Sequence, residues 1–395
     1  MKIPNSSFLS KRAMALKPSL TLEITAKAKE LKRQGVDICG LSAGEPDFDT
    51  PNFIIEETIK ALQNGITKYG PAAGDPELRE ALADKLIKIN KIETSIENIL
   101  VTNGGKQAIY NLFQVVLNPG DEVLIPAPYW LSYPEMVLLA GANPVLVNSY
   151  QANDFKLTLD KLEAQVSEKT RLLIINSPCN PTGLIITKLE MENIAEFLRR
   201  HPKILLMSDE IYEFILEDGQ EHHSFASIAP DISERVFTVN GFAKGWAMTG
   251  WRVGYLAGNT EIIKKATALQ SQTTSNVCSF AQRGALAALK GPKDAIEKMV
   301  AIYNSRRKIL IKGLEDIEGL SLTKPQGAFY AFPKIEKGNF SSIEFCQIAL
   351  DKVGLSIIPG LAFGDDSCIR ISCATSTETI YEGLNRLQDL MKGLN

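Results

Sequence analysis

The stretch Val239-Asn-Gly-Phe-Ala-Lys-Gly-Trp-Ala-Met-Thr-Gly-Trp-Arg-Val-Gly254 joins two short apolar runs, 235–239 and 253–257, through a loop rich in glycine and tryptophan. Lys244 follows the first run closely, and Arg252 comes eight residues later. Apolar and aromatic surroundings strip water from an ammonium and favour the neutral amine, which is the form that condenses with an aldehyde. A nearby arginine suits an oxyanion such as a phosphate. The alternative is a solvated loop lysine beside a structural arginine.

Outward from this stretch, short strand-like runs alternate with helical patterns. The strands are expected at 99–101, 122–125, 144–147, 171–175, 203–207, 236–239 and 253–257. Helices are expected at 24–34, 52–64, 77–89, 106–117, 130–139, 159–166 and 188–200. This alternation indicates an α/β sheet covered by helices on both faces. Long helices follow residue 261, and then come strands near 328–332 and 368–372 and a closing helix from 378. The prediction is a large domain over 46–285 and a smaller α+β domain formed by 1–45 with 286–395.

Composition excludes several classes of function. The net charge is −3, and no basic block suggests nucleic acid or an anionic membrane surface. No apolar run has the length of a membrane span. The six cysteines form no C-x-x-C pair and the three histidines form no H-E-x-x-H motif, so no metal site is predicted. Isolated thiols suit a reducing cytoplasm, which is the expected location.

Polar and glycine residues gather where the expected strands end, which is where open α/β sheets bind ligands. They are Gly104, Gly105, Lys106, Trp130, the segment 176–180, Asp209 and the segment 240–244. Gly104 and Gly105 precede a helix, whose free N–H groups and dipole attract phosphate. A P-loop is excluded because Gln107 stands where Ser or Thr would follow Gly-Lys, and no G-x-G-x-x-G motif follows a strand.

Together these motifs resemble those of the class I aminotransferases, enzymes of fold type I that bind pyridoxal 5'-phosphate (PLP). The resemblance runs from Pro18-Ser19 to Arg370. It implies that Lys244 binds PLP covalently, that Asp209 pairs with the pyridine nitrogen, and that this pairing makes the ring an electron sink. The resemblance also implies that Tyr212 and Asn180 form hydrogen bonds to the cofactor's phenolic oxygen and that Trp130 stacks on its ring. The cofactor's phosphate is expected to bind to Gly104, Gly105, Lys106 (main chain) and Arg252. Tyr69 resembles the tyrosine that family members send across a homodimer interface to the neighbouring phosphate. The sequence departs from the family at Gly241, where a serine often adds a phosphate contact.

The same resemblance assigns the substrate carboxylate to Arg370, whose guanidinium can form two parallel bonds, with support from Gly44 and Asn180. Lys106, in Gly-Gly-Lys-Gln, together with Lys17 and Pro18-Ser-Leu-Thr21, resembles the bacterial aspartate subgroup. The resulting hypothesis is ping-pong transamination of aspartate with 2-oxoglutarate, in which freed Lys244 moves the proton and Asp209 and Tyr212 assist. Three alternatives stay open: prephenate or another amino or 2-oxo acid as substrate, a PLP lyase or decarboxylase, and a regulatory protein that retains the fold.

Overall fold

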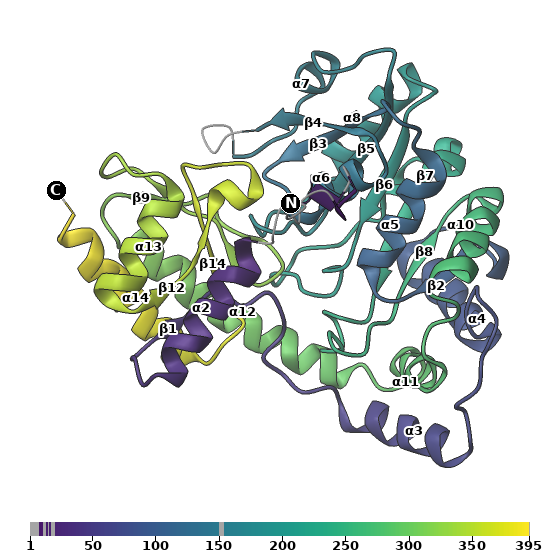
Figure 1. Cartoon of the computed structure of the whole chain (residues 1–395), viewed down its shortest axis with the longest axis horizontal. Coiled ribbons are helices and arrows are strands. Elements are labelled where there is room, and N and C mark those ends of the chain that lie inside the picture. Colours follow the sequence, from purple (N-terminus) through teal and green to yellow (C-terminus); the bar gives the residue numbers. More distant parts are fainter. Residues whose placement is uncertain (1–7, 11–12, 15, 17–19, 150–153, 395) are drawn as a thin grey trace, which may run out of the picture.

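The computed structural model describes residues 8–10, 13–14, 16, 20–149 and 154–394. Its centre is a seven-stranded sheet with the order β2-β8-β7-β6-β5-β3-β4, in the blue to teal part of Figure 1. The strands are β2 (Ile99–Thr102), β3 (Glu122–Ala127), β4 (Asn143–Asn148), β5 (Thr170–Asn176), β6 (Leu205–Asp209), β7 (Val236–Gly241) and β8 (Gly254–Ala257). Within this sheet β8 is antiparallel to both of its neighbours, and the other pairs are parallel.

Side chains of these strands alternate between two apolar layers, as the two-residue period of a strand requires. Leu100, Met207 and Val239 face one layer, with helices α5 (Gly105–Val116), α6 (Ser132–Leu139) and α10 (Thr260–Thr273). Leu124 and Leu206 face the opposite layer, with α8 (Lys188–Arg200) and α9 (Phe225–Ile228). Because both faces are covered, β6, β7 and β8 are buried throughout, which explains their continuous apolar runs.

The remaining helices beside the sheet are α3 (Asn52–Gln63), α4 (Pro76–Lys85), the π-helix η2 (Leu86–Asn90), the 3-10 helices η3 (Ile96–Asn98) and η5 (Pro230–Arg235), α7 (Leu159–Glu163) and α11 (Ser279–Lys290). Among these, α3, α4 and α11 share an apolar cluster with β2 and β8. The predicted helix over 77–89 therefore exists, but its last turn widens into a π-helix.

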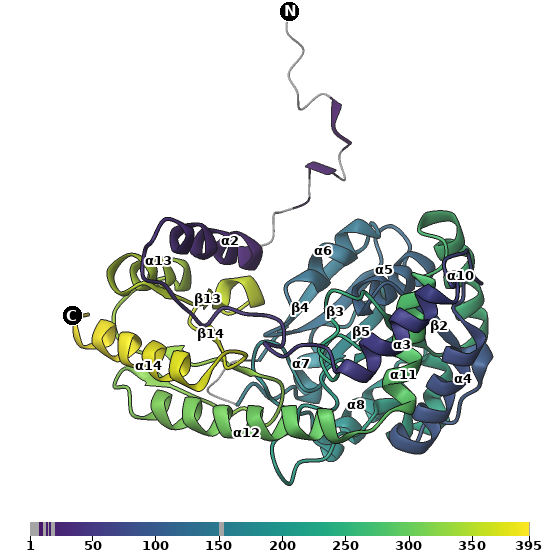
Figure 2. The same cartoon turned by 90° about the horizontal axis from the view of Figure 1, so that it is seen from below.

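The smaller part of the molecule combines both ends of the described chain, because β1 (Cys39–Gly40) pairs in parallel with β12 (Leu355–Ser356). Its other elements are α2 (Leu20–Arg33), β9 (Leu320–Ser321), β10 (Tyr330–Ala331), β11 (Lys334–Ile335), α13 (Ser342–Val353), β13 (Ile358–Pro359), η6 (Gly360–Phe363), β14 (Ile369–Ser372) and α14 (Thr377–Lys392). The strand expected over 328–332 is thus only two residues long. Figure 2 shows the 22-residue α12 (Asp294–Glu315) running along both parts.

The predicted domain limits at 45/46 and 285/286 remain a prediction. The second limit falls inside α11, which packs with α3 and α4. We therefore propose that the change of domain occurs at the turn 291–293, between α11 and α12. Among the described residues, no helix combines the length and apolar character needed to cross a bilayer.

Candidate active site

The register of the sheet explains how distant residues meet at one edge. Asn176 and Asp209 are paired at the ends of β5 and β6. At the other side Gly241 ends β7 opposite Gly254, which begins β8. Since β8 runs antiparallel, its start lies at the same edge as the ends of the parallel strands, and Arg252 arrives there just before it. A cavity of about 670 Å³ opens at this edge, and Gly44, Lys106, Trp130, Asn180, Asp209, Tyr212, Lys244, Arg252 and Arg370 line it.

Lys244 is held at the centre of this cavity. Its Nζ donates to the carbonyl of Gly44 at 2.5 Å and lies 5.7 Å from the ring centres of both Tyr212 and Phe329. Burial lowers its pKa to about 8, Arg370 and Arg252 act in the same direction, and Glu45 and Asp209 oppose them. At pH 7 about one-tenth of Lys244 is therefore the neutral, nucleophilic amine, far more than of a lysine with the ordinary pKa.

An anion cradle lies where α5 begins. No side chain caps this helix, and its N-cap Gly104 has a φ of 78°. A Cβ on Gly104 would lie 2.5 Å from Nη2 of Arg252, so only glycine lets the guanidinium lie over the helix N-terminus. The Arg252 guanidinium is positioned by the carbonyls of Thr249 (2.9 Å) and Asn103 (3.3 Å). Exposed N–H groups, a helix dipole and a cation together suit a phosphate.

The glycine at position 241 has a structural reason. A Cβ there would lie 2.8 Å from Cα of Gly254 and 3.0 Å from the carbonyl oxygen of Val253. A serine at this position would therefore push β7 and β8 apart, which explains why glycine stands here.

Asp209, only 5% exposed, accepts a 2.6 Å hydrogen bond from the hydroxyl of Tyr133 and a 3.2 Å bond from the N–H of Ile211. Burial raises its pKa to about 6, although both hydrogen bonds oppose the rise. Tyr133 was missed by sequence reasoning. Its one signal is the three-residue spacing between Trp130, just before α6, and Tyr133 in the first turn of that helix; the two rings lie edge to face with their centres 5.3 Å apart.

Arg370 is a buried cation, 3% exposed, on β14. Its guanidinium donates to Asn180 Oδ1 at 3.0 Å and to the carbonyl of Ser42 at 3.1 Å. It lies between the rings of Tyr330 (4.4 Å) and Phe363 (4.9 Å). Burial lowers its pKa. Its Nε is buried without a hydrogen-bond partner, and in the described part of the chain no carboxylate forms an ion pair with it.

The remaining predicted residues take different places. The Nζ of Lys106 lies 4.9 Å from the ring centre of Trp130, and burial together with Arg252 lowers its pKa. The hydroxyl of Tyr212 is 2.9 Å from that of Tyr330, a second residue that the sequence did not reveal. Tyr69 is 91% exposed and is not part of this cavity. Lys17, Pro18 and Ser19 lie outside the described residues.

One polar cluster near the site has the residue types of a metal site: Glu210, Glu213 and His222. Its carboxylates are already engaged, because Glu213 accepts from Lys85 (2.5 Å) and Asn90 (2.8 Å). Glu210 accepts from Ser208 and Ser224 and lies 3.1 Å from His222. The Lys85 ammonium already supplies the positive charge of this cluster. We therefore infer that the cluster stabilises the segment that carries Asp209 and does not bind a metal.

The site fits PLP on its own geometry. The cradle at Gly104 and Arg252 suits the phosphate, Asp209 suits a pyridinium and Lys244 suits an aldehyde. The Arg370 guanidinium, which lines the cavity, suits a substrate carboxylate. A mostly parallel sheet with this set of groups at its edge defines a PLP-dependent aminotransferase of fold type I.

Comparisons with known proteins agree with this class. The family model for class I and II aminotransferases matches residues 36–387. A probable aspartate/prephenate aminotransferase of Rickettsia felis is 45% identical over 97% of this chain and 96% of its own length. An aspartate aminotransferase of Bacillus sp. (strain YM-2) is 44% identical over 97% of this chain and 99% of its own. The structure of Thermus thermophilus aspartate aminotransferase with maleate has a TM-score of 0.93 and 42% identity, covering 97% and 99% of the two chains. The chain belongs to the class I and II aminotransferase family.

Proposed function

We propose that this enzyme transaminates aspartate with 2-oxoglutarate, and that the residues named above take the predicted roles. The observation that carries the proposal is the buried Arg370 guanidinium, which lines the cavity and forms no ion pair with a carboxylate among the described residues. Every amino acid and 2-oxo acid supplies such a carboxylate. The relatives' names support aspartate, and prephenate is the second candidate because the Rickettsia felis relative is named for both.

The residues divide the work of binding and proton transfer. PLP, when bound, supplies the electron sink that stabilises negative charge at the substrate's Cα. Asp209 holds a proton at the pyridine nitrogen, Tyr212 and Asn180 orient the ring oxygen, and Trp130 covers the ring. The Nζ of Lys244, once free and neutral, can take the proton from the substrate's Cα. It can then give the proton to a second carbon that lies within its reach in the same cavity.

The preference for a dicarboxylate rests on Lys106. Its ammonium lies in the same cavity as Arg370 but on a different wall, beside Trp130. Two cations at separate places suit a substrate with two carboxylates. Replacement of Lys106 should therefore weaken the binding of aspartate much more than the binding of alanine.

The first experiment is the absorbance spectrum of the protein reconstituted with PLP. Aspartate should bleach the visible band and 2-oxoglutarate should restore it, while alanine should act far more slowly. Lys106→Met should lower kcat/KM for aspartate about 10- to 100-fold, because it removes one charge-assisted hydrogen bond. The kcat/KM for alanine should change little. Lys188→Met, an exposed lysine on α8, is the matched control. Bleaching by apolar amino acids alone would refute aspartate, and ammonia or carbon dioxide release without an acceptor would indicate a lyase.

We also propose a homodimer whose sites are shared. Ile55, Ile59 and Leu62 form an exposed apolar strip along α3, and Tyr69 projects almost fully exposed after that helix. Such a strip is typical of a surface that a second copy covers. The cytoplasmic location stays a prediction, consistent with six cysteines that are all free.

A further inference from the structure

Glu45 is an acidic residue of the catalytic cavity that the mechanism above does not use. It directly follows Gly44, whose carbonyl accepts the hydrogen bond from Nζ of Lys244. One oxygen of its carboxylate accepts a 2.8 Å bond from the hydroxyl of Thr249. The carbonyl of the same Thr249 accepts from Arg252, so this threonine ties Glu45 to the loop that carries both the lysine and the arginine.

The charges around Lys244 make this position significant. The cavity that holds Lys244 is also lined by two arginines, Arg370 and Arg252, and by two carboxylates, Glu45 and Asp209, and all four influence its charge. The ring of Tyr212 and that of Phe329 complete its surroundings. The carboxylate of Asp209 is bound by Tyr133 and, in the proposed function, by the cofactor's pyridine nitrogen. Glu45 is the stronger of the two acidic influences on Lys244.

Resting on the proposed function, we propose that Glu45, fixed by Thr249 beside Gly44, is a positioning residue that stabilises Lys244 in its protonated form. The physical reason is the reaction cycle. A proton that moves from Cα to Nζ creates an ammonium in a cavity that disfavours it, since burial lowers the pKa of Lys244. A fixed carboxylate offsets this cost and lets one amine both accept and return a proton near neutral pH.

The direct test uses the cofactor-free full-length chain, so it does not depend on activity. The rate at which an acylating reagent modifies Lys244 is followed against pH by peptide mass spectrometry, because only the neutral amine reacts. In the wild type the midpoint should fall at about pH 8. Glu45→Gln keeps an acceptor for the Thr249 hydroxyl but removes the charge, so the midpoint should move to lower pH.

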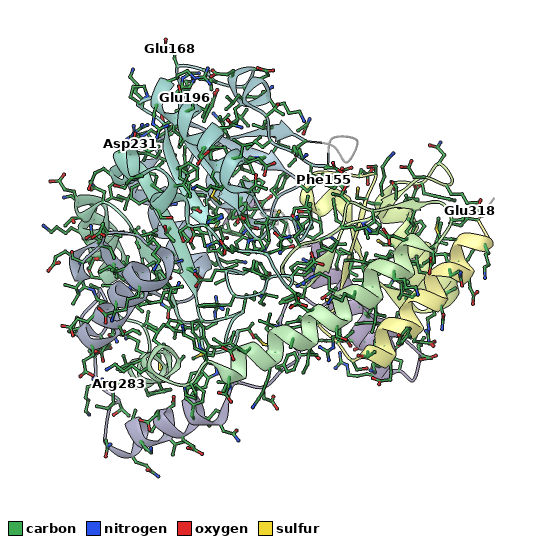
Figure 3. All side chains as sticks on the ribbon, turned by 180° about the vertical axis from the view of Figure 1, so that it is seen from behind. Phe155, Glu168, Glu196, Asp231, Arg283 and Glu318 are labelled. Atoms are coloured by element: carbon green, nitrogen blue, oxygen red, sulfur yellow. The ribbon has the colours of Figure 1, made fainter. Side chains whose placement is uncertain are left out.

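Three further variants separate charge from general structure. Thr249→Val should move the midpoint in the same direction by freeing the carboxylate, and Thr249→Ser should restore it. Glu168→Gln removes an exposed charge at the far edge of the large domain, seen in Figure 3, and should leave the midpoint unchanged. An unchanged midpoint in Glu45→Gln would overturn the proposal. A shift in Glu45→Gln without one in Thr249→Val would overturn the role of Thr249.

With the reconstituted enzyme, Glu45→Gln should lower kcat for aspartate about 3- to 10-fold with little change in KM, since the defect lies in proton transfer. A change confined to KM would indicate a substrate contact and overturn the proposal. If aspartate fails to bleach the cofactor but the midpoint of Lys244 shifts as expected, the proposed substrate is wrong and the coupling between Glu45 and Lys244 stands.

Discussion

The hydrogen bond between Tyr133 and Asp209 makes a quantitative prediction. Tyr133→Phe removes one oxygen from a buried pair and leaves the ring, and its edge-to-face contact with Trp130, in place. The variant should bind PLP normally in alkaline solution and lose affinity as the pH falls, at a higher pH than the wild type does. The reason is that only the ionised Asp209 can hold a proton on the pyridine nitrogen.

The magnitude follows from the geometry. A hydrogen bond to a charged group contributes about 1.5–3 kcal/mol, and the 2.6 Å distance between two buried groups places this bond in that class. This bond lowers the pKa of Asp209, which burial has raised to about 6. Its loss should raise that pKa by about 1–2 units, since one unit corresponds to about 1.4 kcal/mol. At pH 7 the ionised fraction of Asp209 should fall from about nine-tenths to between about one-half and one-tenth.

The assay is the dissociation constant of PLP from the cofactor-free protein, measured from pH 5.5 to 9 by the quenching of intrinsic fluorescence. Titration of PLP itself is the same for every variant and cancels in the comparison. Tyr129→Phe is the matched control, because it makes the same chemical change at a tyrosine outside the catalytic cavity. Superimposable pH profiles for wild type and Tyr133→Phe would refute the reasoning, as would an equal loss of affinity at every pH.

Three other predictions follow from the site. Arg370→Lys should lower kcat/KM for every amino acid substrate about 10- to 150-fold without changing PLP affinity, since an ammonium cannot form the two parallel bonds; an effect limited to dicarboxylates would contradict it. Gly104→Ala should lower the free energy of unfolding by about 1–3 kcal/mol in a denaturant titration, because its φ of 78° with a ψ of 167° suits only glycine. It should also weaken PLP binding by displacing Arg252, and an unchanged PLP affinity would place the phosphate elsewhere. Tyr69→Phe should weaken PLP about tenfold, and mixing it with inactive Lys244→Ala chains should recover activity, because a hybrid dimer contains one complete site; no recovery would argue against sharing.

Much of this architecture is present in local sequence patterns. The short apolar runs of β2 to β8 and the three-to-four-residue spacing in the covering helices are short-range signals, so the order of elements could be predicted. The apolar run before Lys244 and its eight-residue separation from Arg252 likewise allowed their chemistry to be predicted, because both residues belong to one loop. The glycine at 104 indicated a cradle for the same reason: its conformation is a property of the turn itself.

Other features depend on contacts between residues far apart in the chain. Tyr133 meets Asp209 across 76 residues, Arg370 meets Asn180 across 190, and Thr249 meets Glu45 across 204. No local period encodes such pairings, because they depend on how elements far apart in the chain pack together. The sequence by itself was enough to predict the fold class, which is confirmed, and the cofactor lysine and anion cradle, which stay predictions. Only the tertiary structure decided which groups set the charge of Asp209 and Lys244, because burial and neighbouring charge arise from packing.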